Sequence, residues 1–202
     1  MTDLFSRLSD VFERGHAKSV TELMSDARFA QADRSANAAV LIAVTDRPEP
    51  GLILTQRPQG MRDHPGQVAL PGGKLDPGEN AIEAALREAD EELALPPQHV
   101  RIVGSTDRYK TGTGFDVTPV VGVIPPDLDL TPNPEEVEAW FEVPLSLVME
   151  RNNWAKQEVF WRGEMRHYLE MDYEGFRIWG ITAGILANLS QRLAYDELIN
   201  GR

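Results

Sequence analysis

The stretch from Pro71 to Leu95, PGGKLDPGENAIEAALREADEELAL, constrains this chain most because it joins a glycine-rich turn to an acid-rich helix. Asn80 and Glu83 have the spacing of a capping box, which predicts that the helix begins just after Asn80. At a period of 3.6 residues, one narrow apolar stripe should face a core. Its members are Ile82, Ala85, Leu86, Ala89 and Leu93.

Three glutamates, Glu88, Glu91 and Glu92, should lie along one flank of this helix. Glu88 and Glu92 are one turn apart, where like charges repel and destabilise a helix unless a cation neutralises them. A hard divalent ion such as Mg²⁺ suits a site built from oxygen alone. Considered by itself, such an acid pair is more typical of a solvated helix face, so the spacing of the surrounding residues must decide.

That spacing is specific. Gly73 is followed after five residues by Glu79, and after seven more by the run READEE from Arg87 to Glu92. The pattern resembles the Nudix box, G-x5-E-x7-R-E-U-x-E-E-x-G-U, in which U is a bulky aliphatic residue. Every charged position of the box is present.

Two positions depart from the box: Ala89 is a small residue at a U position, and Ala94 replaces the last glycine. Glycine would ease the exit from the helix by allowing positive φ. We therefore expect Ala94 to extend the helix by a few residues, until Pro96 and Pro97 stop it. Neither change removes a ligand.

The resemblance implies a hydrolase in which Mg²⁺ or Mn²⁺ ions activate water against a diphosphate. The implied metal ligands are Glu88, Glu91, Glu92 and the backbone carbonyl of Gly72. Arg87 and Glu79 would hold these ligands in place, the alternative being an ordinary surface ion pair. The general base stays open between a box carboxylate, Glu91, and a distant loop acid, Glu135 or Glu136. For Glu136 a solvated loop acid is the favoured interpretation.

The segment just upstream, Leu52 to Gly73, reads LILTQRPQGMRDHPGQVALPGG. It resembles the signature of coenzyme A pyrophosphatases within the Nudix superfamily, L-L-T-x-R-[SA]-x3-R-x3-G-x3-F-P-G-G. The matching residues are Leu54, Thr55, Arg57, Arg62, Gly66, Pro71, Gly72 and Gly73, whereas Ile53, Pro58 and Leu70 depart from it. The run IWGITA from Ile178 to Ala183 also looks like that subfamily.

This second resemblance implies that Arg57 and Arg62 contact phosphate oxygens of the substrate, where forked guanidinium donors fit well. The alternative is that one of them only pairs with a loop acid such as Asp63. We expect His64 to end a turn before Pro65 rather than to bind phosphate. Trp179 is a candidate to stack on an adenine, although an aromatic beside an apolar helix is more often core.

Taken together, these resemblances imply hydrolysis of coenzyme A or acyl-coenzyme A to 3′,5′-ADP and 4′-phosphopantetheine or its acylated form. A Nudix pyrophosphatase for another substrate, such as ADP-ribose or NADH, is the first alternative. A non-catalytic binding module is a weaker one, because loss of a ligand would be its simplest mark and all the glutamates are intact.

Composition limits the partners and the compartment. The net charge of −12 argues against nucleic acid as a partner, and no apolar run approaches a membrane span. The chain has no cysteine, which excludes disulfides and thiolate sites, and its histidines form no ligand pair for zinc. Its N-terminus lacks the pattern of a signal peptide, so we expect a cytoplasmic protein.

The order of elements, with the Nudix resemblance, predicts an α/β/α sandwich around a mixed β-sheet. We expect a helical extension at residues 1–35, amphipathic from 2 to about 31, and a Nudix hydrolase domain at residues 36–202. The extension should pack on this domain rather than on the partner of a homodimer. Expected strands are Ala38–Thr45, Leu52–Gln56, Val100–Thr106, Val117–Ile124 and Val137–Val143, followed by a hairpin of Gln157–Trp161 with Met165–Glu170 and a helix over Ile181–Leu198.

Overall fold

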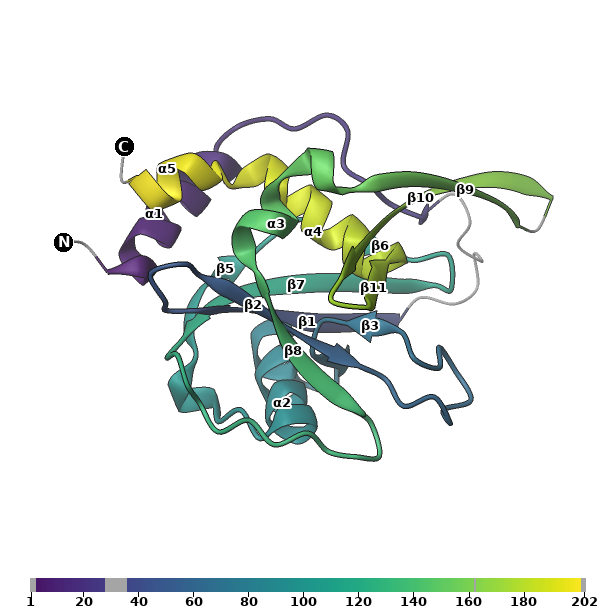
Figure 1. Cartoon of the computed structure of the whole chain (residues 1–202), viewed down its shortest axis with the longest axis horizontal. Coiled ribbons are helices and arrows are strands. Elements are labelled where there is room, and N and C mark those ends of the chain that lie inside the picture. The colour runs from purple at the N-terminus through teal and green to yellow at the C-terminus, as the bar shows by residue number, and fades with distance from the viewer. Residues whose placement is uncertain (1–2, 28–35, 162, 201–202) are drawn as a thin grey trace.

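A mixed sheet forms the centre of the molecule in the computed structural model, which describes residues 3–27, 36–161 and 163–200 (Figure 1). The main path of this eight-stranded sheet runs β3 (Val68–Ala69), β2 (Gly51–Gln56), β1 (Ala36–Thr45), β7 (Phe115–Ile124) and β5 (Arg101–Ser105). Off this path, β4 (Gly72–Lys74) pairs with β1, β6 (Tyr109–Lys110) with β7, and β8 (Ala139–Pro144) with β2. Only β1 and β7 run parallel; the other pairs are antiparallel.

The central strand β1 explains why both faces of the sheet are covered. Ala39, Leu41 and Ala43 point into one core, with Ala84, Ala85 and Ala89 of helix α2 (Ala81–Leu93). The alternate residues Ala38, Ile42 and Val44 point into a second core on the opposite face. Because successive strand side chains point to opposite faces, an apolar strand such as β1 requires a cover on each side.

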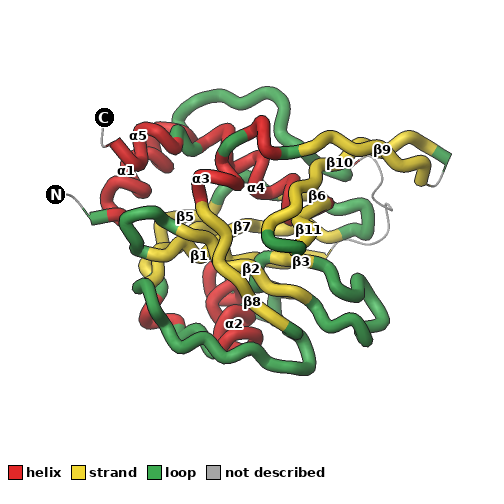
Figure 2. Tube along the Cα trace, in the orientation of Figure 1, coloured by secondary structure: helices red, strands yellow, loops and turns green. Residues whose placement is uncertain are grey.

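The second core is covered by helices from both ends of the chain. They are α1 (Leu4–His16), α3 (Leu145–Met149), α4 (Gly180–Arg192) and α5 (Tyr195–Asn200). Single 3₁₀ turns lie at Pro97–His99, which contacts α2, and at Arg151–Asn153, which contacts α3. Figure 2 shows these helices above the sheet and α2 below it. The mixed sheet between two helical layers confirms the expected α/β/α sandwich.

A smaller three-stranded sheet lies beside α4. Its order is β11 (Phe176–Trp179), β10 (Glu164–Tyr173) and β9 (Ala155–Trp161), and all its pairs are antiparallel. The predicted hairpin is therefore present, with a third strand, β11, that the sequence pattern did not indicate. The β9–β10 hairpin projects from the body of the molecule (Figure 1).

Within the described residues 3–27, α-helix is confined to α1, so the expectation that the helix continues through residues 17–26 is wrong. Val20, Leu23 and Met24 lie in non-helical chain instead. The buried Asn188 accepts a hydrogen bond from the Met24 N–H (2.7 Å) and donates one to the Met24 carbonyl (2.9 Å). These bonds use backbone groups that a helix would need. Residues 28–35, and with them the proposed domain boundary, lie outside the described residues.

The last predicted helix, Ile181–Leu198, is broken in two. Leu193 has extended backbone angles (φ −98°, ψ 114°) and separates α4 from α5. Both Leu193 and Leu198 are buried, so the change of direction brings apolar side chains from both helices into the same core. Among the described residues, none of the helices has the length and apolar character needed to cross a membrane.

Candidate metal centre

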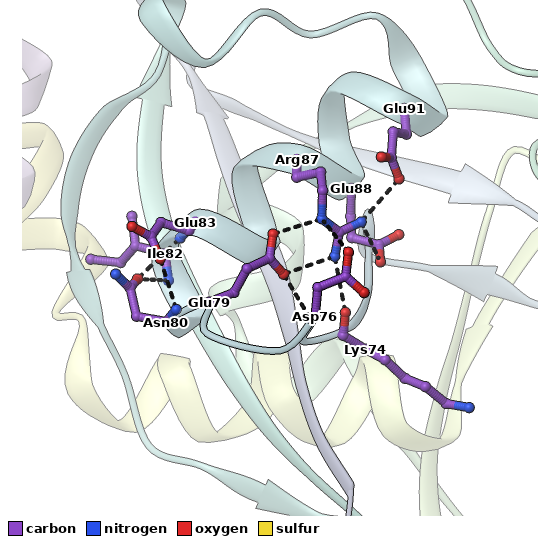
Figure 3. A network of polar contacts seen from close by, with 9 residues as sticks. All are labelled: Lys74, Asp76, Glu79, Asn80, Ile82, Glu83, Arg87, Glu88 and Glu91. Carbon is purple, nitrogen blue, oxygen red and sulfur yellow. Dashed lines mark hydrogen bonds and ion pairs between the residues drawn. The ribbon is translucent and has the colours of Figure 1, made fainter.

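Helix α2 begins as the sequence predicts. The Asn80 side chain accepts hydrogen bonds from the N–H groups of Ile82 (2.9 Å) and Glu83 (3.1 Å), and the Glu83 carboxylate accepts one from the Asn80 N–H (2.8 Å) (Figure 3). This reciprocal pair confirms the capping box. It fixes the start of α2 and therefore the phase at which the later glutamates leave the helix.

The end of α2 differs from the prediction. The helix stops at Leu93, and Ala94 takes a left-handed conformation (φ 51°) instead of extending it. The N–H groups of Ala94 and Leu95 donate to the carbonyls of Asp90 and Ala89, which closes the helix as a glycine would. Leu95 is fully buried, and its burial in the core offsets the strain of an alanine at positive φ.

Three carboxylates meet beside this helix. Glu88, Glu92 and Glu136 each offer an oxygen, and these oxygens lie within 4.8 Å of one another. We call these three residues the acid group. Glu92 is only 5% exposed, which is unusual for a carboxylate. The structure thus adds Glu136, for which a solvated loop acid was the favoured interpretation.

The loop that carries Glu136 docks on the end of α2 through its backbone. The N–H groups of Thr131 and Asn133 donate to the carbonyls of Leu93 and Glu92, each at 2.9 Å. These carbonyls have no partner within the helix, so the loop satisfies them. Val137, next to Glu136, is buried in the core under α2. The sequence signal for this placement was an apolar residue, Val137, directly after the two acids Glu135 and Glu136.

The electrostatics of the acid group favour a cation. Burial, followed by the negative charge of Glu88, raises the pKa of Glu92 from 4.5 to about 8. Burial also raises the pKa of Glu88, although a hydrogen bond from Arg87 opposes this shift. Both raised pKa values indicate that nearby positive charge does not fully offset the burial of these carboxylates.

Arg87 holds the acids of the box together (Figure 3). Its guanidinium donates to both oxygens of Glu79 (2.8 and 3.1 Å), to Glu88 (3.1 Å) and to Glu91 (3.0 Å). It also donates to the Lys74 carbonyl in β4 (3.0 Å). The hydrogen bonds from Arg87 are the main cause of the lowered pKa of Glu79. The Glu91 side chain lies on the outside of this network and is 53% exposed.

Two glycines let the chain pass close to these acids. At Gly73, an added Cβ would lie 2.3 Å from a carboxylate oxygen of Glu88. Gly72 has φ 155°, and its Cβ would lie 2.3 Å from the Ala39 carbonyl oxygen. The Gly72 N–H donates to Glu92 at 3.3 Å. A side chain at Gly72 would clash with the backbone of β1, and one at Gly73 would clash with the Glu88 carboxylate of α2, so the close approach of the turn to both elements favours glycine here.

The two predicted substrate arginines lie in the loop between β2 and β3. Arg57 is partly buried, its Nε is buried without a hydrogen-bond partner, and its positive charge acts on Glu92. Arg62 is exposed further along the loop. Within the described parts of the chain, neither arginine forms an ion pair with Asp63. His64 has φ 54°, in keeping with the turn expected there.

The donor set fits the divalent ion that the sequence implies. It consists of oxygen ligands only and combines several negative charges. Its most buried carboxylate, Glu92, forms no ion pair with any cationic side chain in the described part of the chain. Hard ions such as Mg²⁺ and Mn²⁺ prefer this chemistry. Glu91 and the Gly72 carbonyl stay predicted ligands.

Known proteins resemble this chain over more than half of its length. The model of the NUDIX domain matches residues 35–162. An uncharacterized Nudix hydrolase, NudL, from Escherichia coli K12 is 45% identical over 157 residues, which cover 77% of this chain and 82% of that protein.

Two crystal structures are also similar. The Nudix hydrolase RenU from M. smegmatis is 25% identical with a TM-score of 0.49, covering 56% of this chain and 73% of that one. An Ap4A hydrolase from C. elegans is 22% identical with a TM-score of 0.47, covering 55% and 81%. Because the domain match spans more than half of this sequence and the identity to NudL extends over most of both proteins, the chain belongs to the Nudix hydrolases.

Proposed function

We propose that this Nudix hydrolase cleaves the diphosphate linkage of coenzyme A or an acyl-coenzyme A. Water adds to one phosphorus and the bridging P–O bond breaks, which releases 3′,5′-ADP and 4′-phosphopantetheine or its acylated form. One observation supports this substrate above others. The segment that resembles coenzyme A pyrophosphatases, Leu52 to Gly73, lies next to the most buried acid of the site. The positive charge of Arg57 acts on Glu92, and the Gly72 N–H donates a hydrogen bond to the Glu92 carboxylate.

The acid group holds the metal in this proposal. Glu88, Glu92 and Glu136 supply carboxylate oxygens from the helix and the docked loop, and Glu91 and the Gly72 carbonyl complete the set. When bound, Mg²⁺ or Mn²⁺ neutralises the diphosphate oxygens and lowers the pKa of a coordinated water.

The remaining box residues position these ligands. Arg87 acts through Glu88 and Glu91, whose carboxylates it contacts, and Glu79 holds the guanidinium of Arg87 from the other side. Glu79 and Glu91 are the box carboxylates outside the acid group, and Glu91 is the more exposed of the two (53% against 19%). We therefore propose that Glu91 also accepts a proton from the attacking water, through the carboxylate oxygen that does not bind the metal.

Arg57 and Arg62 bind the substrate in this proposal. A guanidinium can donate two parallel hydrogen bonds to a phosphate, and Arg57 is close enough to the site for its positive charge to act on Glu92. Arg62, exposed on the same loop, can reach a phosphate that lies outside the acid group. We expect Arg62→Ala to raise KM for coenzyme A while kcat and the fold change little.

The test compares coenzyme A, acetyl-coenzyme A, ADP-ribose and NADH, each with Mg²⁺ and with Mn²⁺, and separates products by chromatography. We expect 3′,5′-ADP from the first two at a much higher kcat/KM than turnover of the others, and loss of this activity in Glu92→Gln. Preference for ADP-ribose or NADH would assign the chain to another Nudix substrate. Binding of coenzyme A without turnover under any condition would make it a binding module.

A further inference from the structure

A cavity of about 410 Å³ opens beside the loop that carries Arg57 and Arg62. This loop contributes Gln67 to the lining, and the small sheet contributes Tyr168, Arg177 and Trp179. The volume lies in the range of small-molecule sites in proteins. The acid group does not line this cavity, so the cavity is a separate part of the surface.

One wall of the cavity is aromatic and held in place. The rings of Tyr168 and Trp179 meet edge to face, with centroids 5.8 Å apart. The Arg177 guanidinium lies 4.8 Å from the centre of the Trp179 ring. Arg177 in turn donates to Glu170 at 2.8 Å and to the Tyr168 hydroxyl at 3.1 Å. These contacts limit the rotamers of the wall, so a ligand meets a preformed surface.

The charges around the cavity are balanced. Arg177 of β11 is paired with Glu170, and Arg166 of the neighbouring strand β10 is paired with the buried Asp26. Paired guanidiniums attract an additional phosphate weakly. The lining therefore suits a flat, uncharged group that can stack on an indole, while the Gln67 amide offers polar contacts at its edge. A nucleobase has these properties.

The cavity and the acid group are joined by a short length of chain. Strand β11, which ends at Trp179, lies against β3, and Thr182 at the start of α4 donates to the Val68 carbonyl at 3.0 Å. From Gln67 at the cavity to Gly72 at the acid group, five residues span at most about 18 Å. One extended substrate can reach both sites.

We propose that this cavity binds the nucleobase of the substrate, which stacks on Trp179 while the diphosphate lies at the acid group. This inference rests on the proposed function, because it assigns the adenine half of coenzyme A to the cavity and leaves the pantetheine arm outside it. Trp179 is then a substrate-binding residue.

The experiment measures binding of the two products separately to the Mg²⁺-loaded protein by calorimetry. In Trp179→Ala, we expect the Kd for 3′,5′-ADP to rise about tenfold or more, the effect of losing a stack between a base and an aromatic ring. The Kd for 4′-phosphopantetheine should not change. Trp179→Phe keeps a flat ring and should bind 3′,5′-ADP nearly as well. Binding of 3′,5′-ADP should quench the tryptophan fluorescence of the wild type, and Trp179→Phe should lose this quenching.

Phe160→Ala is the matched control, since Phe160 is 68% exposed on the hairpin and does not line the cavity. Unchanged 3′,5′-ADP binding in a folded Trp179→Ala protein would overturn the proposal, and so would weaker binding of 4′-phosphopantetheine alone. If Trp179→Ala does not fold, the comparison of the wild type with Trp179→Phe decides. Addition of 3′,5′-ADP should quench the tryptophan fluorescence of the wild type more than that of Trp179→Phe, and equal quenching would overturn the proposal. Binding of 3′,5′-ADP requires no hydrolysis, so its dependence on Trp179 is judged separately from turnover of coenzyme A.

Discussion

Glu136 reaches the acid group through backbone contacts that its neighbours make. Thr131 and Asn133 bind the last carbonyls of α2, and Val137 enters the core beside them. The Glu136 carboxylate is thereby held near Glu88 and Glu92, although 44 residues separate it from Glu92 (136 − 92). The adjacent Glu135 is exposed and is not one of the carboxylates that meet there.

This difference between neighbours gives the first prediction. Glu136→Gln should weaken Mg²⁺ binding by about tenfold or more, because it removes one of the negative ligands of a hard ion. Glu135→Gln should leave the affinity within about twofold, since an exposed acid near the site adds only a screened charge. Calorimetric titration with Mg²⁺ measures both. Equal affinities for the two variants would remove Glu136 from the metal centre.

A second prediction concerns pH. Because the pKa of Glu92 rises from 4.5 to about 8 on folding without metal, the folded state binds this proton more tightly than the unfolded state. The stability that Glu92 contributes is therefore present below about pH 4.5 and is lost as the pH rises to about 8. Metal binding needs the carboxylate and releases the proton, so stabilisation by Mg²⁺ should increase over the same range.

Thermal unfolding in EDTA and in Mg²⁺, at several pH values between about 5 and 8, measures this linkage. Glu92→Gln cannot ionise and serves as the control: its melting temperature in EDTA should fall less with rising pH than that of the wild type. A wild-type profile parallel to that of Glu92→Gln would contradict the raised pKa.

At the scale of elements, the exit of α2 decides how the acid group is assembled. The left-handed Ala94 turns the chain so that Leu95 enters the core and the following loop can return to the helix end. An alanine in this conformation is strained by roughly 1–2 kcal/mol, whereas glycine is not. The family pattern has glycine here, and this chain adopts the same exit without it.

The third prediction follows from that strain. Ala94→Gly should raise the free energy of unfolding by about 1 kcal/mol, which corresponds to about 2–4 °C in Tm for a chain of this size. Ala85→Gly, in the buried interior of the same helix, should lower it by about 1 kcal/mol or more. Denaturant unfolding of both variants measures the change. A less stable Ala94→Gly would mean that Ala94 is not left-handed.

At the scale of the whole molecule, the two ends of the chain close one layer of the sandwich. Helix α1 lies against β5, α4 and α5 (Figure 1). The Arg192 side chain, from the end of α4, donates to both oxygens of Asp107 and to the carbonyls of Gly15 and Lys18. Gly15 approaches so closely that a Cβ would lie 1.8 Å from the Arg192 carbonyl oxygen.

The fourth prediction tests this contact. Gly15→Ala forces α1 away from α4 and should cost about 1–3 kcal/mol of stability, as overpacking in a core does. Gly60→Ala has no atom within 4 Å of the new Cβ, and should leave stability unchanged or raise it by up to about 1 kcal/mol. Thermal unfolding compares the two. A neutral Gly15→Ala would show that α1 does not pack closely on α4.

Local patterns in the sequence were sufficient for the parts of the fold that depend on neighbouring residues. The capping box, the apolar stripe of α2 and the long strands β1, β2 and β7 follow from spacing within one element, because helices and strands repeat over a few residues. The same local spacing identified the box acids and Arg87. It failed at Met24 and Leu193, where contacts with distant residues replace helical bonds.

The sequence by itself determined the family, the α/β/α sandwich and the presence of the clustered glutamates on one helix, because local sequence patterns are sufficient to predict each of them. Only the tertiary structure decided that Glu136 joins those acids, that Ala94 turns left-handed, and that Trp179 lines a cavity rather than a closed core. The physical reason is common to all three. Each depends on contacts between backbone groups and apolar side chains that are distant in the sequence, and the short-range periodicity of helices and strands does not specify such contacts.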